Sequence, residues 1–264
     1  MDLSPLIPSE PRTLPEGCQT LGRSCEEALL EQRLSPWRRS DHVSNLLVLL
    51  AATRTAEHPG ISAAGATAES RRFTALADAE LLLEGPSGKR RWPLPPLPAG
   101  VSPALLSHVA LNHLPLSPLL AAIGLEHPAP FPHLRLESGR WGPADCLSGG
   151  RAMPQARVER LWRQGMHLGN RLRGPVLLTE CVPGGTTTAQ AVLSALGVSV
   201  GSLISGSAQQ PPQRLKRMLV DQGLQGASLP DRPSPTAVLA AVGDPFQAVA
   251  AGFLVAARQP LSLI

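Results

Sequence analysis

Apolar runs along the chain predict the strands of a parallel sheet. Residues 44–52 form a continuous apolar run that ends in polar sequence, as expected for a strand buried on both faces. A second run at 116–123 predicts another strand, although Pro118 weakens that prediction because proline lacks a backbone donor. Residues 176–179 predict the central strand, and residues 260–264 predict a further one at the end of the chain.

Segments with helical periodicity separate these runs. Thr67 can cap a helix that continues to about Leu82, and Ser102 followed by proline opens a shorter helix. Apolar residues at a spacing of 3.6 predict a long amphipathic helix after Pro154. Further helices are expected at about 187–196 and 211–223 and directly after Ser234 and Asp244. Strands that alternate with helices predict an α/β fold class, a doubly wound (Rossmann-like) parallel sheet flanked by helices, over residues 43–264.

The first 42 residues follow a different pattern. They are rich in Pro, Arg, Ser and Glu, and they show little periodicity beyond a short helix predicted at 25–34. We expect residues 1–42 to form a peripheral or partly disordered arm. The Pro-rich connection at 85–102 is expected to cover the domain as a loop rather than to bind an SH3-type partner.

Composition narrows the classes of function. The net charge is +4, and the basic residues, all arginine except Lys89 and Lys216, are scattered without interleaved aromatics, so no nucleic-acid partner is expected. The longest apolar run is far shorter than the ~20 residues of a membrane span, and the N-terminus is no signal peptide, so we expect no membrane partner and a cytoplasmic location. No metal and no other cofactor is expected, because the cysteines lack metal-site spacing and are expected to be reduced thiols. They are Cys18, Cys25, Cys146 and Cys181.

The most informative stretch is the turn between the 176–179 strand and the next helix, which contains Gly184 and Gly185 followed by three threonines. Paired glycines let a backbone approach a ligand closely, and the first N–H groups of a helix have no intrahelical partner. The turn therefore suits an anion such as phosphate, although an ordinary strand-to-helix turn could carry the same glycines. It lacks the Gly-Lys-Ser/Thr ending of a P-loop, and no G-x-G-x-x-G fingerprint occurs.

Three further polar residues are candidates for function. Ser62 lies in a loop of small residues after the first strand, at the edge where α/β sheets bind ligands, or it satisfies its own turn. Asp78 lies near the end of its helix and is either solvated or functional. Asp244 would cap the helix that follows it, and the sequence does not separate this cap from a ligand contact.

Three segments together resemble one known family. They are Pro59 to Thr67 with the helix that follows, Glu180-Cys181-Val182-Pro183-Gly184-Gly185-Thr186-Thr187-Thr188-Ala189, and Val242 to Gln247. Over about residues 44–264 the chain resembles the divergent branch of the nicotinate-nucleotide:dimethylbenzimidazole phosphoribosyltransferase family. The resemblance implies a doubly wound sheet, a homodimer, and transfer of ribose 5-phosphate from nicotinate mononucleotide to an aromatic base, which makes the lower-ligand nucleotide of a cobamide (vitamin B12).

The resemblance also implies roles for individual residues. Glu180 would be the catalytic residue at the ribose, Ser62 would lie by the acceptor base, Asp244 would contact substrate, and the phosphate would be held by Gly184, Gly185, Thr186 and Thr187. Family members continue into a Gly-Gly-Thr-Gln-Met segment, and the presumed catalytic carboxylate of the better-known branch lies beyond residue 264. We therefore expect a domain truncated at its C-terminal end. Two hypotheses stay open, a phosphoribosyltransferase and a non-catalytic nucleotide- and phosphate-binding remnant of that family.

Overall fold

The structure is a computed structural model, and it describes residue 14 and residues 27–38, 44–94, 102–201, 203–206, 208, 210–257 and 261–263. The expectations for Cys18 and Cys25, for most of the N-terminal arm and for residues 95–101 lie outside these ranges. The helix predicted at 25–34 is described as α1 (Glu27–Arg38). No helix in the described ranges is long and apolar enough to cross a membrane.

Five parallel strands form one sheet in the order β3-β2-β1-β4-β5. They are β1 (Ser44–Ala51), β2 (Leu116–Ile123), β3 (Leu134–Arg135), β4 (Val176–Cys181) and β5 (Leu261–Leu263). The four predicted strands are confirmed, whereas the two-residue β3 is too short for the apolar pattern to have predicted it. β1 is central, since its Leu47 pairs with Leu119 of β2 on one side and with Leu178 of β4 on the other.

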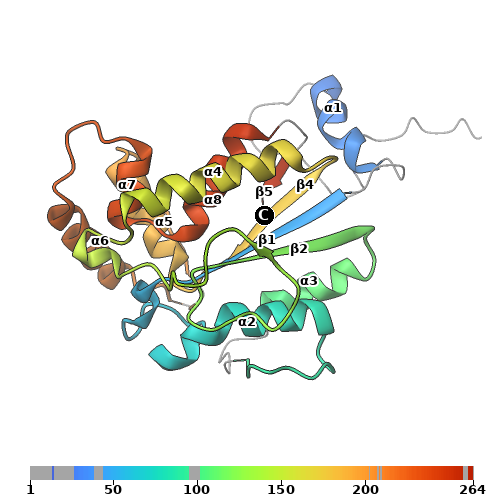
Figure 1. Cartoon of the computed structure of the whole chain (residues 1–264), viewed down its shortest axis with the longest axis horizontal. Coiled ribbons are helices and arrows are strands. Elements are labelled where there is room, and N and C mark those ends of the chain that lie inside the picture. The colour runs from blue at the N-terminus through green and yellow to red at the C-terminus, as the bar shows by residue number, and fades with distance from the viewer. Residues whose placement is uncertain are drawn as a thin grey trace, which may run out of the picture.

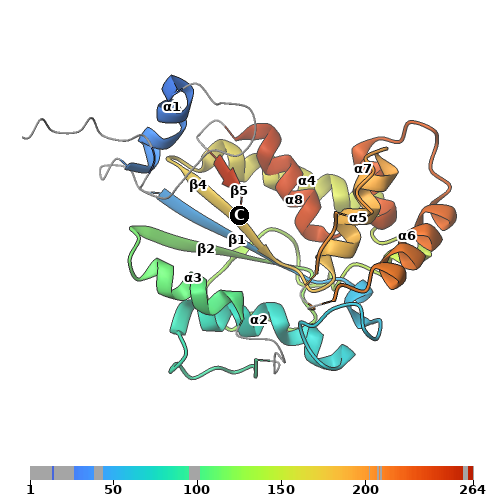
Figure 2. The same cartoon turned by 180° about the vertical axis from the view of Figure 1, so that it is seen from behind.

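Helices cover both faces of the sheet, as the doubly wound prediction requires (Figure 1). One face carries α2 (Ala68–Glu84) and α3 (Pro103–Leu111), and the other carries α4 (Gln155–Arg171) and α8 (Pro245–Ala256). Beyond one end of the sheet lie α5 (Gly185–Ala195), α6 (Gln213–Ala227) and α7 (Pro235–Val242), while α1 lies near the opposite end (Figure 2). Two short 3-10 helices, η1 (Arg54–Glu57) and η2 (Leu147–Gly149), complete the described elements.

The apolar run of β1 is explained by burial on both faces. Leu47 and Leu49 belong to the core against α4 and α8, whereas Leu46, Val48 and Leu50 belong to the core against α2. Successive side chains of a strand point to opposite faces, so a strand between two helical layers needs apolar residues at every position.

Four helix starts follow the predicted capping chemistry. The Thr67 and Asp244 side chains each complete a capping box at the start of α2 and α8. The Ser102 and Ser234 hydroxyls each accept a backbone hydrogen bond before a proline in the first turn. These caps fix the residues at which the four helices begin.

Two helix boundaries differ from the prediction. α5 begins at Gly185, two residues earlier than expected, because Gly184 takes the left-handed conformation (φ +81°) and serves as its N-cap. α6 does not stop at Gly223 but continues to Ala227. A Cβ atom at Gly223 would lie 2.4 Å from the Leu147 carbonyl oxygen, so this glycine permits the close approach of η2 rather than ending the helix.

The chain reverses its direction across the sheet between β1 and β4. The connection from β1 to β2 runs through α2 and α3 on one face, and the connection from β4 to β5 runs through α5, α6, α7 and then α8, which covers the other face. The chain therefore leaves the carboxyl ends of the neighbouring strands β1 and β4 toward opposite faces of the sheet. Open α/β sheets bind ligands in the crevice at such a switch point.

Candidate functional site

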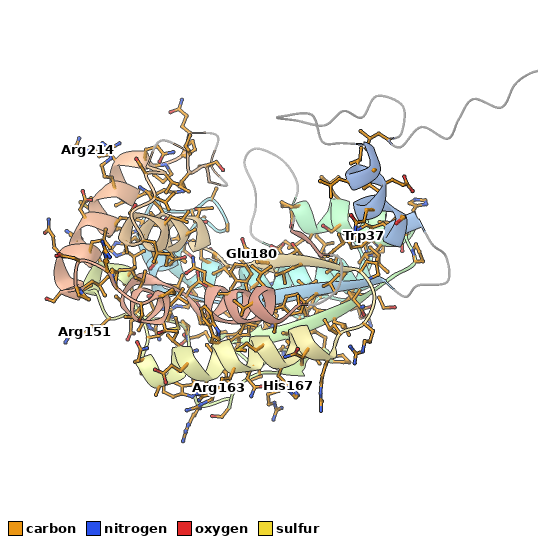
Figure 3. The ribbon with its side chains drawn as sticks, turned by 90° about the horizontal axis from the view of Figure 1, so that it is seen from above. Trp37, Arg151, Arg163, His167, Glu180 and Arg214 are labelled. Carbon is orange, nitrogen blue, oxygen red and sulfur yellow. The ribbon has the colours of Figure 1, made fainter. Side chains whose placement is uncertain are left out.

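A cavity of about 360 Å³ lies at this switch point, on the side of the sheet that carries α2 and α3. Its volume falls in the range of small-molecule sites. β1 and β4, α2 and α3, the loop after β1 and the turn after β4 all contribute to its lining. Figure 3 shows Glu180 near the middle of the molecule, whereas Arg163 and His167 project from the outer side of α4.

The N-terminus of α5, which follows the turn after β4, faces this cavity. Gly184 has a positive φ, and a Cβ atom there would lie 3.0 Å from the backbone nitrogen of Ala56, so glycine is needed for both conformation and space. A Cβ atom at Gly185 would lie 3.9 Å from Glu180 Oε2. No side chain caps α5, so the positive end of its dipole is available to an anion.

Part of the backbone at this turn is already hydrogen-bonded. The N–H of Gly185 donates to Val182 O at 2.8 Å, and the N–H of Thr187 donates to Gly184 O at 2.9 Å. An anion at the turn would therefore depend on side-chain donors as well as on the helix end. The exposed hydroxyl of Thr186 lines the cavity and is such a donor.

Lys216 supplies a cation at the same turn. It is fully buried, and its Nζ donates to Thr186 Oγ1 at 2.9 Å and to the Ser205 carbonyl. Burial lowers the pKa of the Lys216 amine, and among the described residues no carboxylate pairs with it. Lys216 was assigned no role from the sequence. The signal that would have found it is its place on the buried stripe of α6 with Leu219 and Gly223.

Glu180 is a carboxyl group close to the turn. It stands at the end of β4 beyond the part that pairs with β5, and it is solvent-accessible within the cavity lining. Desolvation by the surrounding protein raises the pKa of Glu180 to about 7, the charge of Asp244 acts in the same direction, and a backbone hydrogen bond at Val182 opposes both. Such a group can take up and release a proton near neutral pH.

Asp244 lies behind the turn rather than in the cavity lining. Its carboxylate is fully buried and accepts hydrogen bonds from the Gln247 N–H at 3.1 Å and from the Thr188 hydroxyl at 2.6 Å. Burial raises the pKa of Asp244 to about 6, and the hydrogen bonds from Thr188, Gln247 and Phe246 oppose this. Asp244 thus links the N-terminus of α8 to α5 and acts on Glu180 through its charge.

The structure brings five of the predicted site residues to the cavity, namely Ser62, Glu180, Gly184, Gly185 and Thr186. It does not bring Thr187 or Asp244 to the lining, because both are buried beside it. Thr187 Oγ1 has no hydrogen-bond partner within the described part of the chain. Ser62 Oγ accepts from the N–H of Ala64 at 3.1 Å, so this serine stabilises its own turn and lines the cavity as well.

Arg71 fixes the loop that carries Ser62. Its buried guanidinium donates to the carbonyls of Ala56, Gly65 at 2.8 Å, His58 at 3.2 Å and Glu57 at 3.3 Å. The Arg71 side chain therefore forms hydrogen bonds with carbonyls at both ends of the loop. The loop is held against the cavity without a regular element of its own.

Asp78 of α2 also lines the cavity, and its partners come from distant parts of the sequence. The Ser102 hydroxyl donates to Oδ1 at 2.6 Å, and the Cys181 thiol donates to Oδ2 at 3.4 Å. Burial raises the pKa of Asp78, and these two hydrogen bonds oppose the shift. Burial also raises the pKa of the Cys181 thiol well above its usual value, which keeps this donor protonated.

Metal-ligand geometry is absent from the described ranges, in which no group of three or more His, Cys, Asp or Glu side chains is placed to hold an ion. Two cysteines are described, Cys146 and Cys181, and both are free thiols.

No family model matches this sequence. The chain is 70% identical over 259 residues to a UPF0284 protein of Parasynechococcus marenigrum (strain WH8102), with 98% of this chain and 66% of the relative covered. It is 56% identical over 261 residues to a UPF0284 protein of Prochlorococcus marinus (strain MIT 9313), with 97% and 65% covered. The chain therefore spans just under two thirds of the length of these curated relatives.

Two solved structures share the fold. A crystal structure of CobT from Thermus thermophilus matches with a TM-score of 0.61 at 20% identity, over 88% of this chain and 66% of that chain. A nicotinate-nucleotide-dimethylbenzimidazole phosphoribosyltransferase from the same organism matches with a TM-score of 0.54 at 18% identity, over 84% and 60%. At these identities the likeness shows a common α/β architecture.

Proposed function

We propose, from the premise that this chain belongs to the family of UPF0284 proteins, that it is a nicotinate-nucleotide-dependent phosphoribosyltransferase. The reaction transfers ribose 5-phosphate from nicotinate mononucleotide to a nitrogen of an aromatic base such as dimethylbenzimidazole, in the assembly of a cobamide. One observation carries the proposal: the uncapped N-terminus of α5 and a carboxyl group with a pKa of about 7 face the same cavity at the switch point.

In this proposal the phosphate binds at the N-terminus of α5. The backbone of Gly184 and Gly185 lets it approach closely, the Thr186 hydroxyl donates to it, and the Lys216 amine supplies the positive charge. A hydrogen bond between charged groups contributes about 1.5–3 kcal/mol. The helix dipole adds about 0.3–1 kcal/mol, so the lysine and the threonine provide most of the affinity.

The transfer is a substitution at C1′ of the ribose. The bond from C1′ to the nicotinate nitrogen breaks, its electron pair leaves with nicotinate, and the lone pair of the acceptor nitrogen forms the new bond. Positive charge develops on the ribose, and the Glu180 carboxylate beside the phosphate turn stabilises it. Because the pKa of Glu180 is about 7, the same group can take the proton that the base loses.

Titration calorimetry with nicotinate mononucleotide tests the phosphate site. We expect saturable binding by the wild-type chain, loss of binding in Gly185→Asp, and binding about 10- to 100-fold weaker in Lys216→Met. Arg214→Met is the matched control, because Arg214 is exposed on the same helix and points away from the site in Figure 3, so its affinity should not change. A folded Gly185→Asp protein that binds as tightly as the wild type would show that the site lies elsewhere.

Turnover is then measured as nicotinate release in the presence of dimethylbenzimidazole. Glu180→Gln should lower the rate by about 10²- to 10⁴-fold and leave nicotinate mononucleotide affinity within a few-fold. The wild-type rate should rise with pH through about 7, where the Glu180 carboxyl loses its proton. Tight binding without turnover would favour instead the non-catalytic nucleotide-binding protein that the sequence left open.

A further inference from the structure

Asp78 places a second carboxylate on the cavity, on the wall formed by α2. Among the described residues, its donors are one hydroxyl at 2.6 Å and one thiol at 3.4 Å, each directed to a different oxygen. An ionised carboxylate can accept about four hydrogen bonds, and a thiol is a weak donor. Asp78 therefore keeps acceptor capacity toward the cavity.

The surroundings of Asp78 do not neutralise its charge. The described residues that line the cavity include no lysine or arginine, and none of the ion pairs among the described residues includes Asp78. Thr74, Ser107 and Thr179 add hydroxyls to the lining, but much of it is aliphatic, formed by Leu46, Val48, Leu50, Ala79, Leu82, Pro103 and Ala104. A carboxylate among aliphatic groups favours a ligand that brings hydrogen-bond donors, since an unmatched charge costs free energy there.

The cavity also has room for a small ring between aliphatic walls. Its aliphatic side chains come from β1 on one side and from α2 and α3 on the other, and the volume of about 360 Å³ suits a small heterocyclic ligand. Glu180 and the glycine turn line the part of the cavity at the end of β4. A fused ring whose attacking nitrogen faces Glu180 would therefore turn another edge toward α2.

We propose that Asp78 selects the acceptor base: the cavity takes a flat, fused nitrogen heterocycle that presents an amino group to the Asp78 carboxylate. Aminobenzimidazoles and aminopurines belong to this class. The inference rests on the proposed function, because it identifies the bound ring with the acceptor of the transfer. A base with methyl groups on that edge would cover the carboxylate without giving it a donor, so it should be the poorer ligand.

Two ligands of equal shape test this on the wild-type protein. Titration calorimetry at neutral pH compares 5-aminobenzimidazole with 5-methylbenzimidazole, each with and without nicotinate mononucleotide. The substituents are similar in size, so the difference reports the hydrogen bond to Asp78. We expect the amino compound to bind at least about tenfold more tightly in one of the two conditions. Equal binding, a preference for the methyl compound, or no binding of either compound would overturn the inference.

Variants locate the preference. Asp78→Asn keeps the size of the side chain but removes its charge, and it should reduce the preference for the amino compound to about threefold or less. Glu69→Gln is the matched control, since Glu69 is exposed in the first turn of the same helix, and it should keep the full preference. Full preference in a folded Asp78→Asn protein would also overturn the assignment.

The outcomes separate the two proposals. Preference for the amino compound in a protein that neither binds nicotinate mononucleotide nor releases nicotinate would support the base site and reject the transferase. Nicotinate mononucleotide turnover without any preference between the two rings would support the transferase and reject the role of Asp78.

Discussion

Arg157 and Lys216 are both buried cations, but their hydrogen-bond and ion-pair partners differ. At the start of α4, the Arg157 guanidinium donates to both oxygens of Glu137, at 3.0 and 2.7 Å, and to the carbonyl of Gly142 at 2.9 Å. Its central carbon also lies 5.2 Å from the centroid of the Trp141 ring. Beside the cavity, the Lys216 amine meets only a hydroxyl and a carbonyl within the described residues.

This difference in partners suggests different roles: the Arg157 charge is structural, whereas the Lys216 charge is suited to binding a ligand. Arg157 has a carboxylate in two-point contact, and both partners are almost completely buried, so its charge is balanced without any ligand. Lys216 has no such partner, and burial lowers the pKa of its amine. Under the proposed function, the positive charge of Lys216 beside the turn after β4 would favour a bound anion, and a bound anion would stabilise the fold.

The largest effect is expected when the balanced pair is broken. Glu137→Ala should lower the free energy of unfolding by about 3–5 kcal/mol, because it leaves the Arg157 charge buried without a partner. Denaturant unfolding measures the change. Glu159→Ala, which removes an exposed carboxylate of α4, should change stability by no more than about 0.5 kcal/mol.

A second variant checks the cause of that loss. Replacing both Glu137 and Arg157 by methionine removes the charges together, so much of the lost stability should return. A loss below about 1 kcal/mol in Glu137→Ala would mean that water reaches Arg157 and that its burial is less complete than the structure indicates.

The next effect concerns the carboxyl group behind the turn. The pKa of Asp244 is raised from 3.8 to about 6 in the folded chain, so folding retains its proton over that interval. The unfolded chain releases the proton first, and stability attributable to this group falls by about 3 kcal/mol as the pH rises through the interval. Glu180 contributes in the same direction between its usual pKa of 4.5 and about 7.

Asp244→Asn isolates this pH effect, because asparagine is an equally good N-cap and carries no proton to release. The difference in unfolding free energy between variant and wild type should grow in favour of the variant as the pH rises from about 4 to about 6. Parallel pH profiles would show that the buried carboxylate is stabilised by partners other than Thr188 and the backbone of α8.

Local patterns in the sequence were sufficient for most of the fold. The apolar run at 44–52 and the caps at Thr67 and Asp244 depend on neighbours a few residues away, and these elements are present. The helix end predicted at Gly223 was wrong, because this glycine is needed to make room for the backbone of Leu147, which lies in another part of the chain. Local rules cannot distinguish a glycine that ends a helix from one that admits a neighbour.

The site was less accessible to sequence reasoning because its contacts join distant residues. The glycine turn and Glu180 were visible as one continuous motif. Lys216 reaches Thr186 across 30 positions, and Cys181 reaches Asp78 across 103, and no local pattern reports either pair. A buried position for a lysine, inferred from its apolar neighbours on one helix face, is the physical signal that would have placed Lys216 in the site.

The smallest effect on stability is expected at Lys216. Lys216→Met should change the unfolding free energy of the ligand-free chain by no more than about 1 kcal/mol, because methionine fills similar space and removes the cost of burying a charge, while two hydrogen bonds are lost. Thermal unfolding with nicotinate mononucleotide should then separate the proteins. The wild type gains about 2.7 kcal/mol at a ligand concentration 100 times the Kd, and Lys216→Met gains much less. A loss comparable to that of Glu137→Ala would show instead that the protein itself balances the Lys216 charge, and the contrast between the two cations would fail.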